Sequence, residues 1–121
     1  MNKHTELSDF EINRRIAEMD TKNRYVYFEK EQTIFRKFSN GQTQQFNPCN
    51  YPTDAMPIII ENGISLITEG DGVYEAIGGM EIYSENSFLC DFSATSERIY
   101  RVGMEIFLMK KDAENENNNN S

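Results

Sequence analysis

The segment from Ser96 to Asp112 constrains the fold most, because its apolar side chains are not confined to a single stripe. At the 3.6-residue period of an α-helix, two faces of this segment are apolar. Its polar residues are mainly Glu97, Arg98, Arg101 and Glu105. A helix that is apolar around most of its circumference has to be covered on several sides. The sequence therefore predicts a buried C-terminal helix over residues 96–112, at the centre of the core.

Gly103 lies in the middle of this segment, where glycine costs about 1 kcal/mol relative to alanine. Glycine has no Cβ atom and so permits a neighbour to pack closely. We expect Gly103 to mark the close approach of another backbone to the helix.

Two further helices are indicated by their capping residues. Ser8 with Glu11 three residues later has the spacing of a capping box, which predicts a helix from Ser8 to about Asp20. Asp54 is suited to be the N-cap of a short helix over residues 54–62, with Pro57 in its first turn.

The rest of the chain favours short strands. Segments rich in aromatic and β-branched residues, or alternating in polarity, predict strands at 24–29, 33–38, 42–46, 64–69, 73–77, 80–84 and 88–92. Short turns such as Asn40-Gly41 and Gly78-Gly79 separate them. We expect the α+β class: a single small domain in which an antiparallel meander sheet packs with an N-terminal helix, a short middle helix and the buried C-terminal helix.

A chain of 121 residues is of single-domain size. Residues 113–121 are rich in Asn and Glu and offer almost nothing to bury. The sequence therefore predicts one domain over residues 1–112 and a disordered tail over residues 113–121.

The acidic excess is confined to one part of the chain. The net charge is −8, yet residues 1–60 contain eight basic and eight acidic side chains, and no Lys or Arg lies from Phe38 to Glu97. This balance argues against nonspecific binding to nucleic acid or to an anionic membrane, because both require clustered positive charge. It leaves open a local pocket for an anion. The acidic stretch predicts a strongly negative face, which is either a solvated surface or a surface for a basic partner.

Metal, cofactor and catalytic chemistry are not indicated. His4, Cys49 and Cys90 are too few and too far apart for a zinc pattern. His4 lies near an end that we expect to be mobile, and no nucleophile–base pair is recognisable. The sequence predicts a protein that is not an enzyme, that needs no cofactor or metal, and whose cysteines are free, inert thiols.

No targeting segment is recognisable in the sequence. The first residues lack the apolar core of a signal peptide. The longest wholly apolar run, Met56–Ile60, is far too short to cross a membrane. We expect a cytoplasmic protein.

Two groups of residues are candidates for binding. The first is the segment from 46 to 54, which combines aromatic rings, side-chain amides and the start of a helix, at Phe46, Asn47, Asn50, Tyr51, Thr53 and Asp54. The second is Arg98 and Arg101, which share a helical face. Arg101 is surrounded by apolar positions, so two roles stay open: an internal ion pair, with Asp54 as one possible partner, or the grip on a ligand phosphate or carboxylate.

At these positions the chain resembles the NinX-like family of small tailed-phage accessory proteins. The matching blocks are residues 7–17, residues 46–66 and residues 101–109, which together cover about a third of the chain. Met56 stands where the family usually has Trp, and Arg98-Ile99 stands where Asn-Pro often opens the last helix. The resemblance implies a phage-encoded protein that acts in the host bacterial cytoplasm. It implies no particular activity.

Two functional hypotheses follow, because many small phage accessory proteins blunt host defence. In the first, the protein sequesters a small nucleotide-type immune signal without turning it over. Arg98 and Arg101 hold its phosphate, Phe46 or Tyr51 stacks on its base, and amides of the 46–54 segment read its polar edges, within one pocket or across the interface of a homo-oligomer. In the second, the acidic face inhibits a host protein or mimics nucleic acid. A structural or regulatory role with neither activity is the third possibility.

Overall fold

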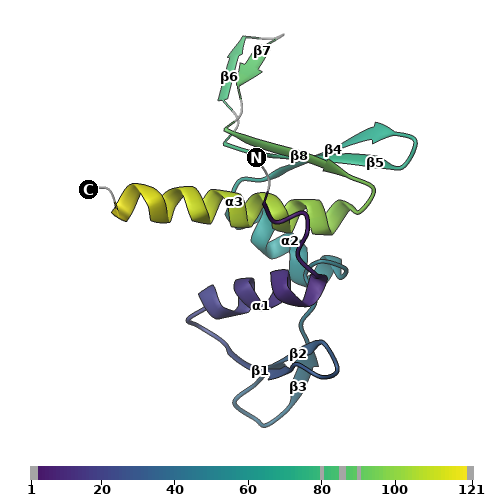
Figure 1. The fold of residues 1–121 in the computed structure, drawn as a ribbon, viewed down its shortest axis with the longest axis vertical. Coiled ribbons are helices and arrows are strands. Elements are labelled where there is room, and N and C mark those ends of the chain that lie inside the picture. Colours follow the sequence, from purple (N-terminus) through teal and green to yellow (C-terminus); the bar gives the residue numbers. More distant parts are fainter. Residues whose placement is uncertain (1–2, 80, 85–86, 90, 120–121) are drawn as a thin grey trace.

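The computed structural model describes residues 3–79, 81–84, 87–89 and 91–119 of the chain. Within these residues lie the helices α1 (Asp9–Met19), α2 (Pro52–Glu61) and α3 (Ile99–Asn119). Helix α3 runs through the middle of the molecule, with one three-stranded sheet on one side and α2 and α1 on the other (Figure 1). A second three-stranded sheet lies beyond α1 (Figure 1).

The buried C-terminal helix is confirmed. Val102, Met104 and Ile106 of α3 are fully buried, and all residues from 101 to 108 are buried. These side chains point to several sides of the helix, and the sheet and the two shorter helices cover them. The burial of this one helix accounts for much of the apolar surface that the fold removes from water.

Gly103 is explained by side chains and not by a backbone. A Cβ atom at this position would lie 3.1 Å from Ile59 Cδ1 of α2 and 3.5 Å from Leu66 Cδ2. Leu66 belongs to the neighbouring sheet, so Gly103 marks the point where side chains from both neighbouring layers close over the helix. The expectation of an approaching backbone is therefore wrong.

Helix α3 differs from its predicted range at both ends. It begins at Ile99 because the preceding residues, Phe92–Ser96, form a strand. It continues past Asp112 to Asn119, because each added residue of an anchored helix gains a backbone hydrogen bond. The end predicted at Asp112 is thus corrected, while the division into a domain of 1–112 and a tail of 113–121 stays a prediction.

Helix α1 begins as its capping box predicts. The side-chain oxygen of Ser8 accepts a hydrogen bond from the backbone N–H of Glu11, at 3.1 Å. The Ser8 hydroxyl also donates to the Glu11 carboxylate at 3.2 Å. The helix ends at Met19, next to the predicted end at Asp20.

Helix α2 begins earlier than predicted. Its N-cap is Tyr51 and its first residue is Pro52, since proline lacks the N–H that has no partner at this position and already has a helical φ. Asp54 is therefore in the first turn and not the N-cap, and Pro57 lies inside the helix. Both expectations about these residues were wrong.

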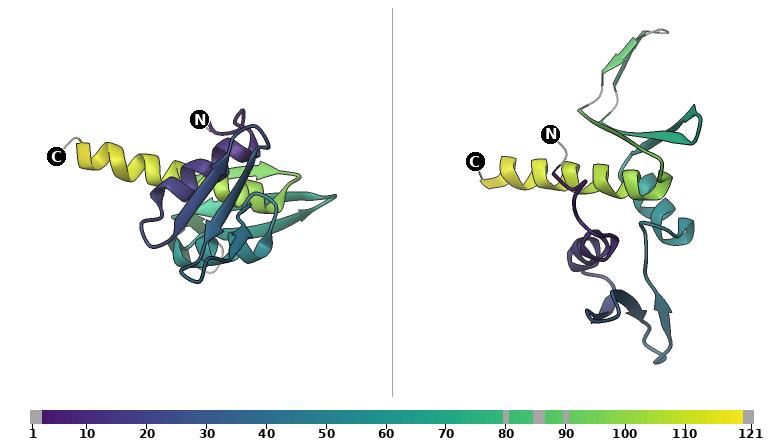
Figure 2. Two further views of the ribbon diagram at one scale, coloured as in Figure 1. Left: turned by 90° about the horizontal axis from the view of Figure 1, so that it is seen from below. Right: turned by 45° about the vertical axis from the view of Figure 1, so that its right-hand side comes forward.

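The strands form separate antiparallel sheets. The first has the order β1 (Arg24–Phe28), β2 (Thr33–Lys37), β3 (Thr43–Gln45). The second has the order β4 (Ser65–Gly70), β5 (Val73–Gly78), β8 (Phe92–Ser96). The strands β6 (Glu81–Ser84) and β7 (Ser87–Leu89) pair with each other and extend away from the body (Figures 1 and 2). The α+β class and the antiparallel pairing are confirmed.

The predicted strand from Phe88 to Phe92 is wrong, because β7 and β8 belong to different sheets. The chain leaves the second sheet at Gly79, whose φ is +71° and where a Cβ atom would collide with the side chain of Asp91. Glycine is the residue that suits this backbone conformation and this close contact. After the Gly78-Gly79 pair the chain leaves the second sheet and forms the β6–β7 hairpin. It then returns to the sheet as β8, which pairs with β5.

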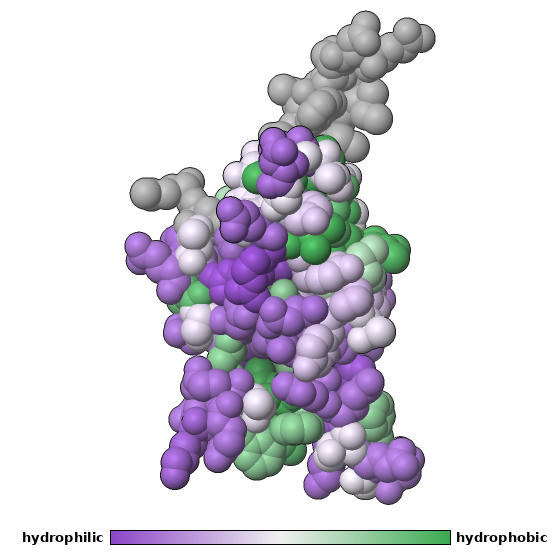
Figure 3. Space-filling model, turned by 90° about the vertical axis from the view of Figure 1, so that its right-hand side faces the viewer, coloured by the Kyte–Doolittle hydropathy of each residue, from purple (hydrophilic) through white to green (hydrophobic). Residues whose placement is uncertain are grey.

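The face drawn in Figure 3 is mostly hydrophilic, with separate apolar patches. Among the described residues, Ile60 of α2 is the most exposed large apolar side chain, at 71%. Isolated apolar residues of this kind are ordinary on a protein surface.

Candidate functional site

The two candidate groups predicted from the sequence meet at Asp9, the first residue of α1. The two terminal guanidinium nitrogens of Arg98 donate to its carboxylate, Nη1 to Oδ1 at 2.9 Å and Nη2 to Oδ2 at 2.6 Å. Arg101 donates to Oδ1 from Nη1 at 2.6 Å. From the other side, Asn50 donates to Oδ2 from Nδ2 at 3.0 Å. One carboxylate therefore joins the start of α1, the start of α3 and the 46–54 segment. We call this cluster of Asp9, Asn50, Arg98 and Arg101 the junction.

Arg101 is a buried ion-pair residue. It is 8% exposed, and its Nε donates to Glu105 Oε2 at 3.0 Å. Its Nη2 lies within hydrogen-bonding distance of three backbone carbonyl oxygens, those of His4, Thr5 and Leu7, at 3.3, 3.1 and 2.6 Å. Of the two roles left open by the sequence, the structure contains the internal ion pair. A buried guanidinium with this many acceptors holds the N-terminal segment against α3.

Asp54 is not the partner of Arg101. Its Oδ2 accepts a hydrogen bond from the backbone N–H of Asn47 at 2.9 Å. Because Asp54 points back at the turn that precedes its own helix, it stabilises that turn and not the arginine.

The negative charge of Asp9 offsets part of the positive charge of Arg98 and Arg101. The hydrogen bonds from Arg98 hold the pKa of Asp9 well below its usual range, and Asn50 and Arg101 add to this effect against the opposing effect of burial. Asp9 is therefore ionised at neutral pH and neutralises part of the charge of both arginines. A ligand phosphate at this place would have to compete with a carboxylate that is already bound.

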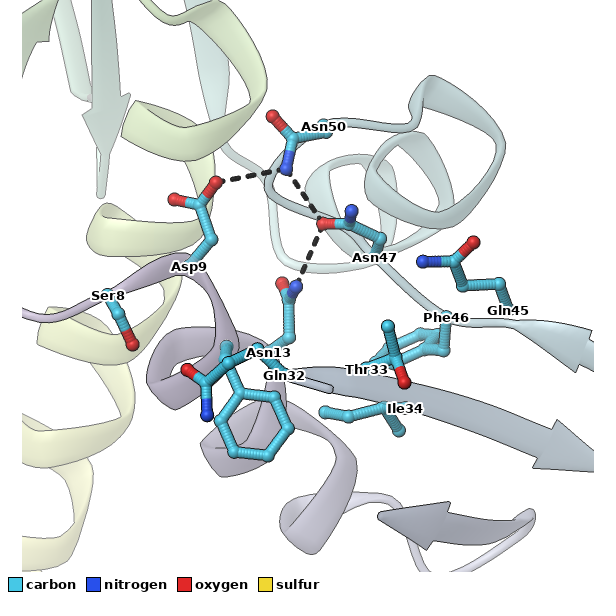
Figure 4. A pocket seen from close by; sticks show the side chains of 11 residues that line it. Ser8, Asp9, Asn13, Gln32, Thr33, Ile34, Gln45, Phe46, Asn47 and Asn50 are labelled. Carbon is cyan, nitrogen blue, oxygen red and sulfur yellow. Dashed lines mark hydrogen bonds between the residues drawn. The ribbon is translucent and has the colours of Figure 1, made fainter. Parts of the chain in front are cut away.

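A cavity of about 370 Å³ lies beside the junction. Its walls come from the start of α1, the start of β2 and the segment after β3, and it carries five side-chain amides: Asn13, Gln32, Gln45, Asn47 and Asn50. Figure 4 shows Asn13, Asn47, Asn50 and Asp9 joined in one chain of hydrogen bonds. The amides face apolar side chains of Phe10, Ile34 and Phe46 across the lining, and among the described residues the only charged one in the lining is Asp9.

The hydrogen bonds leave two amide donors without partners. Asn47 Oδ1 accepts from Asn13 at 2.8 Å and from Asn50 at 2.9 Å, so its own Nδ2 stays available. Gln45 Oε1 accepts from the Tyr51 hydroxyl at 3.4 Å, which leaves its Nε2 available. Neither nitrogen has a hydrogen-bond acceptor among the described residues. They are suited to donate to carbonyl or ring-nitrogen acceptors of a bound molecule.

The eight predicted site residues do not share one pocket. Phe46, Asn47 and Asn50 line the cavity beside the junction. A second cavity, of about 480 Å³, is lined by Phe46 again and by Thr53 and Asp54. Arg98 and Arg101 form the junction, and Tyr51 is 39% exposed at the N-cap of α2. The ring of Phe46 is 4% exposed and packs against Tyr25 at a centroid distance of 5.0 Å, so it is engaged in the core.

Sequence reasoning missed Asp9, Asn13, Gln32 and Gln45. Asp9 looked like an ordinary acidic residue in the first turn of a helix, where it interacts favourably with the helix dipole. Asn13 was a usable signal, because an amide among the apolar positions of α1 is buried, at 5% exposure, and requires partners. Gln32 and Gln45 carried no signal, since they lie just before β2 and at the end of β3, where polar residues are common.

Metal and thiol chemistry have no support in the described residues. No group of three or more His, Cys, Asp or Glu side chains is placed there to hold a metal ion. Burial raises the pKa of the Cys49 thiol to about 12, which leaves it protonated and weakly nucleophilic at neutral pH. Cys90 lies outside the described residues.

The expectation of a mobile terminus around His4 was wrong. His4 is 1% exposed, and its Nε2 lies 2.7 Å from Asp112 Oδ2 of α3.

Among the helices in the described part of the chain, none has the length and apolar character needed to cross a membrane.

We predict unequal effects for the two arginines of the junction. Arg101→Met keeps an apolar stem but leaves buried acceptors without their donor, so it should lower the free energy of unfolding by about 3–5 kcal/mol. Arg98→Met removes a side chain that is 44% exposed and should cost about 1 kcal/mol or less. Urea unfolding at neutral pH measures both, and equal losses would contradict the structural role of Arg101.

The comparisons with known proteins agree with the resemblance seen in the sequence. The model of the family described as Bacteriophage P22, NinX matches residues 3–111, a span that includes the junction and the linings of both cavities. No curated protein and no solved structure matches the chain. Since the family match covers most of its length, the chain belongs to the NinX family of phage proteins.

Proposed function

We propose that this phage accessory protein is a binding protein without catalytic activity that takes up a small nucleotide-type molecule. The site is the amide-lined cavity beside Asp9. The observation that supports this most is a pair of amide donors, Asn47 Nδ2 and Gln45 Nε2, that have no acceptor in the part of the chain that the structure describes and that line a cavity of about 370 Å³. In the host cytoplasm such a protein withholds an immune signal from its receptor.

The chemistry of the cavity suits a base better than a phosphate. Its volume falls within the range of roughly 300–1,000 Å³ that is usual for small-molecule sites. Asn and Gln amides pair with the polar edges of nucleobases, which present acceptors and donors side by side. A base in the cavity satisfies the free amide donors without bringing a second anion against Asp9.

The phosphate of such a ligand belongs at the outer side of Arg98. This side chain is 44% exposed, and the hydrogen bonds to Asp9 and Asn50 come from its Nη1 and Nη2. Its Nε is therefore left to face an incoming phosphate oxygen. Arg101 has no such role in this proposal, because its donors are directed at groups of the protein itself.

The first test is isothermal titration calorimetry against a panel of mononucleotides and cyclic nucleotides. We expect saturable binding of at least one member, and chromatography of the recovered ligand should show it chemically unchanged. No heat with any member, or a ligand converted to product, would contradict the proposal.

The site itself is tested by a matched pair of variants on β3. Gln45→Leu removes one free amide donor, and loss of a hydrogen bond of this kind should weaken binding about threefold to tenfold. Gln44→Leu alters an exposed neighbour that lines neither cavity and should bind like the unaltered protein. Equal affinities of the two variants would place the ligand elsewhere.

A second candidate function is inhibition of a host protein through an acidic surface. It is favoured by the β4–β5 hairpin, where Glu69 and Asp71 are exposed and Glu75 is partly buried, within the stretch that contains no Lys or Arg. Such a surface is suited to a basic nucleic-acid-binding site on its target.

This alternative predicts association that weakens steeply with salt. The double variant Glu69→Lys/Glu75→Lys should lose the host target in surface plasmon resonance, whereas Glu29→Lys/Glu31→Lys, in the turn after β1, should retain it. Salt-independent association would exclude this mechanism.

A further inference from the structure

The second cavity is lined by a guanidinium that has no counter-ion among the described residues. Arg36 of β2 is partly buried and lines this cavity of about 480 Å³. Among the described residues, no carboxylate forms an ion pair with it, and its buried Nε has no hydrogen-bond partner. Buried polar groups in proteins are nearly always satisfied, so an orphaned charged donor requires an explanation.

Aromatic rings hold Arg36 in place without neutralising it. Its guanidinium carbon lies 5.3 Å from the centre of the Phe46 ring and 5.9 Å from that of the Tyr25 ring. Such cation–π contacts orient a guanidinium, and the Tyr25 hydroxyl also interacts with it, which opposes the effect of burial on the pKa of that hydroxyl. These contacts are with neutral groups, so the charge of Arg36 stays available to the cavity that it lines.

The acidic residues that line the same cavity are engaged elsewhere or lie at its edge. Asp20 accepts hydrogen bonds from the Tyr25 hydroxyl, from Asn23 and from the backbone N–H of Lys22, which lower its pKa to about 2 against the effect of burial. Asp54 is bound by the backbone of Asn47. Glu61 is exposed at the end of α2.

The remaining lining is suited to an organic anion. Lys22 and Lys111 add positive charge to the lining, and Lys111 also pairs with Glu114. The rest of the wall is mixed: polar side chains, among them Asn23, Thr53 and Asn62, alternate with a set of apolar ones, Ile16, Met19, Phe46, Pro57, Ile58 and Phe107. A free inorganic ion would leave this apolar surface uncovered.

We propose that the second cavity is a distinct binding site for a small organic oxyanion, whose phosphate or carboxylate pairs with Arg36 while its apolar body packs against α1, α2 and α3. The planar fork of a guanidinium matches the oxygen pair of either group. This site is independent of the nucleotide site beside Asp9, because the two linings have only Phe46 in common.

The probes are phenyl phosphate, benzoate, inorganic phosphate and phenol, titrated into the full chain and followed by ¹H–¹⁵N NMR. Phenyl phosphate or benzoate should shift the Arg36 Nε–H resonance saturably, and inorganic phosphate and phenol should each bind at least about tenfold more weakly. Equal affinity for inorganic phosphate would overturn the assignment to an organic anion. Absence of any shift would overturn the site.

Variants separate a binding role from a structural one. Arg36→Met should abolish the binding of phenyl phosphate and benzoate while leaving the free energy of unfolding unchanged or higher, because it removes an unpaired buried charge. Arg36→Lys keeps the charge but lacks the fork, so it should bind at least about tenfold more weakly. Arg24→Met, an exposed arginine of β1 outside both linings, is the matched control and should bind normally.

The variant Gln45→Leu distinguishes this proposal from the one for the first cavity. It should retain phenyl phosphate binding, since Gln45 lines only the cavity beside Asp9. Binding that survives in Arg36→Met, or that is lost in Gln45→Leu, would overturn the second site, whatever the nucleotide panel shows.

Discussion

The carboxylate of Asp9 is the contact on which the arrangement of this molecule depends. It receives Arg98 and Arg101 from the start of α3 and Asn50 from the turn before α2. These partners lie 41 to 92 residues away along the chain. Apolar packing around α3 supplies most of the driving force for folding, but it does not specify how α1 is rotated and positioned against α3. A partly buried, directional ion pair is suited to that task, although its net stabilisation is small compared with the cost of removing one partner.

The same junction gives the neighbouring cavity its character. Because Asp9 fixes Asn50, and Asn50 and Asn13 both bind Asn47 Oδ1, the amide of Asn47 has a defined orientation with its nitrogen left free. A site of this kind is preorganised, so little order has to be gained when a ligand binds. The two arginines, in contrast, donate their hydrogen bonds mainly to groups of the protein itself and so stabilise the fold. In the proposed function only Arg98 contacts the phosphate of the ligand, with its outer side, whereas the sequence suggested that both arginines would.

How far the sequence predicts this structure differs from element to element. The burial of α3 and of Arg101 could be predicted, because each follows from the local pattern of apolar residues. The strand Phe92–Ser96 was missed, since its serine and alanine residues are weak strand formers and because the β6–β7 hairpin separates it in sequence from β5, with which it pairs. Asp9 could not be assigned, because local sequence does not reveal a partner 92 residues away. Arg36 is a similar case: only the three-dimensional structure reveals that it has no ion-pair partner among the described residues.

The stability of Asp9→Asn as a function of pH tests the account most directly. The pKa of Asp9 is depressed in the folded protein, so its contribution is complete above the unfolded pKa of about 4 and is lost as the pH falls below that value. Urea unfolding should show a less stable variant at pH 7 and a difference from the unaltered protein that shrinks as the pH falls from about 5 to 3. A variant as stable as the unaltered protein at pH 7, or a difference that is independent of pH, would contradict the central role of Asp9.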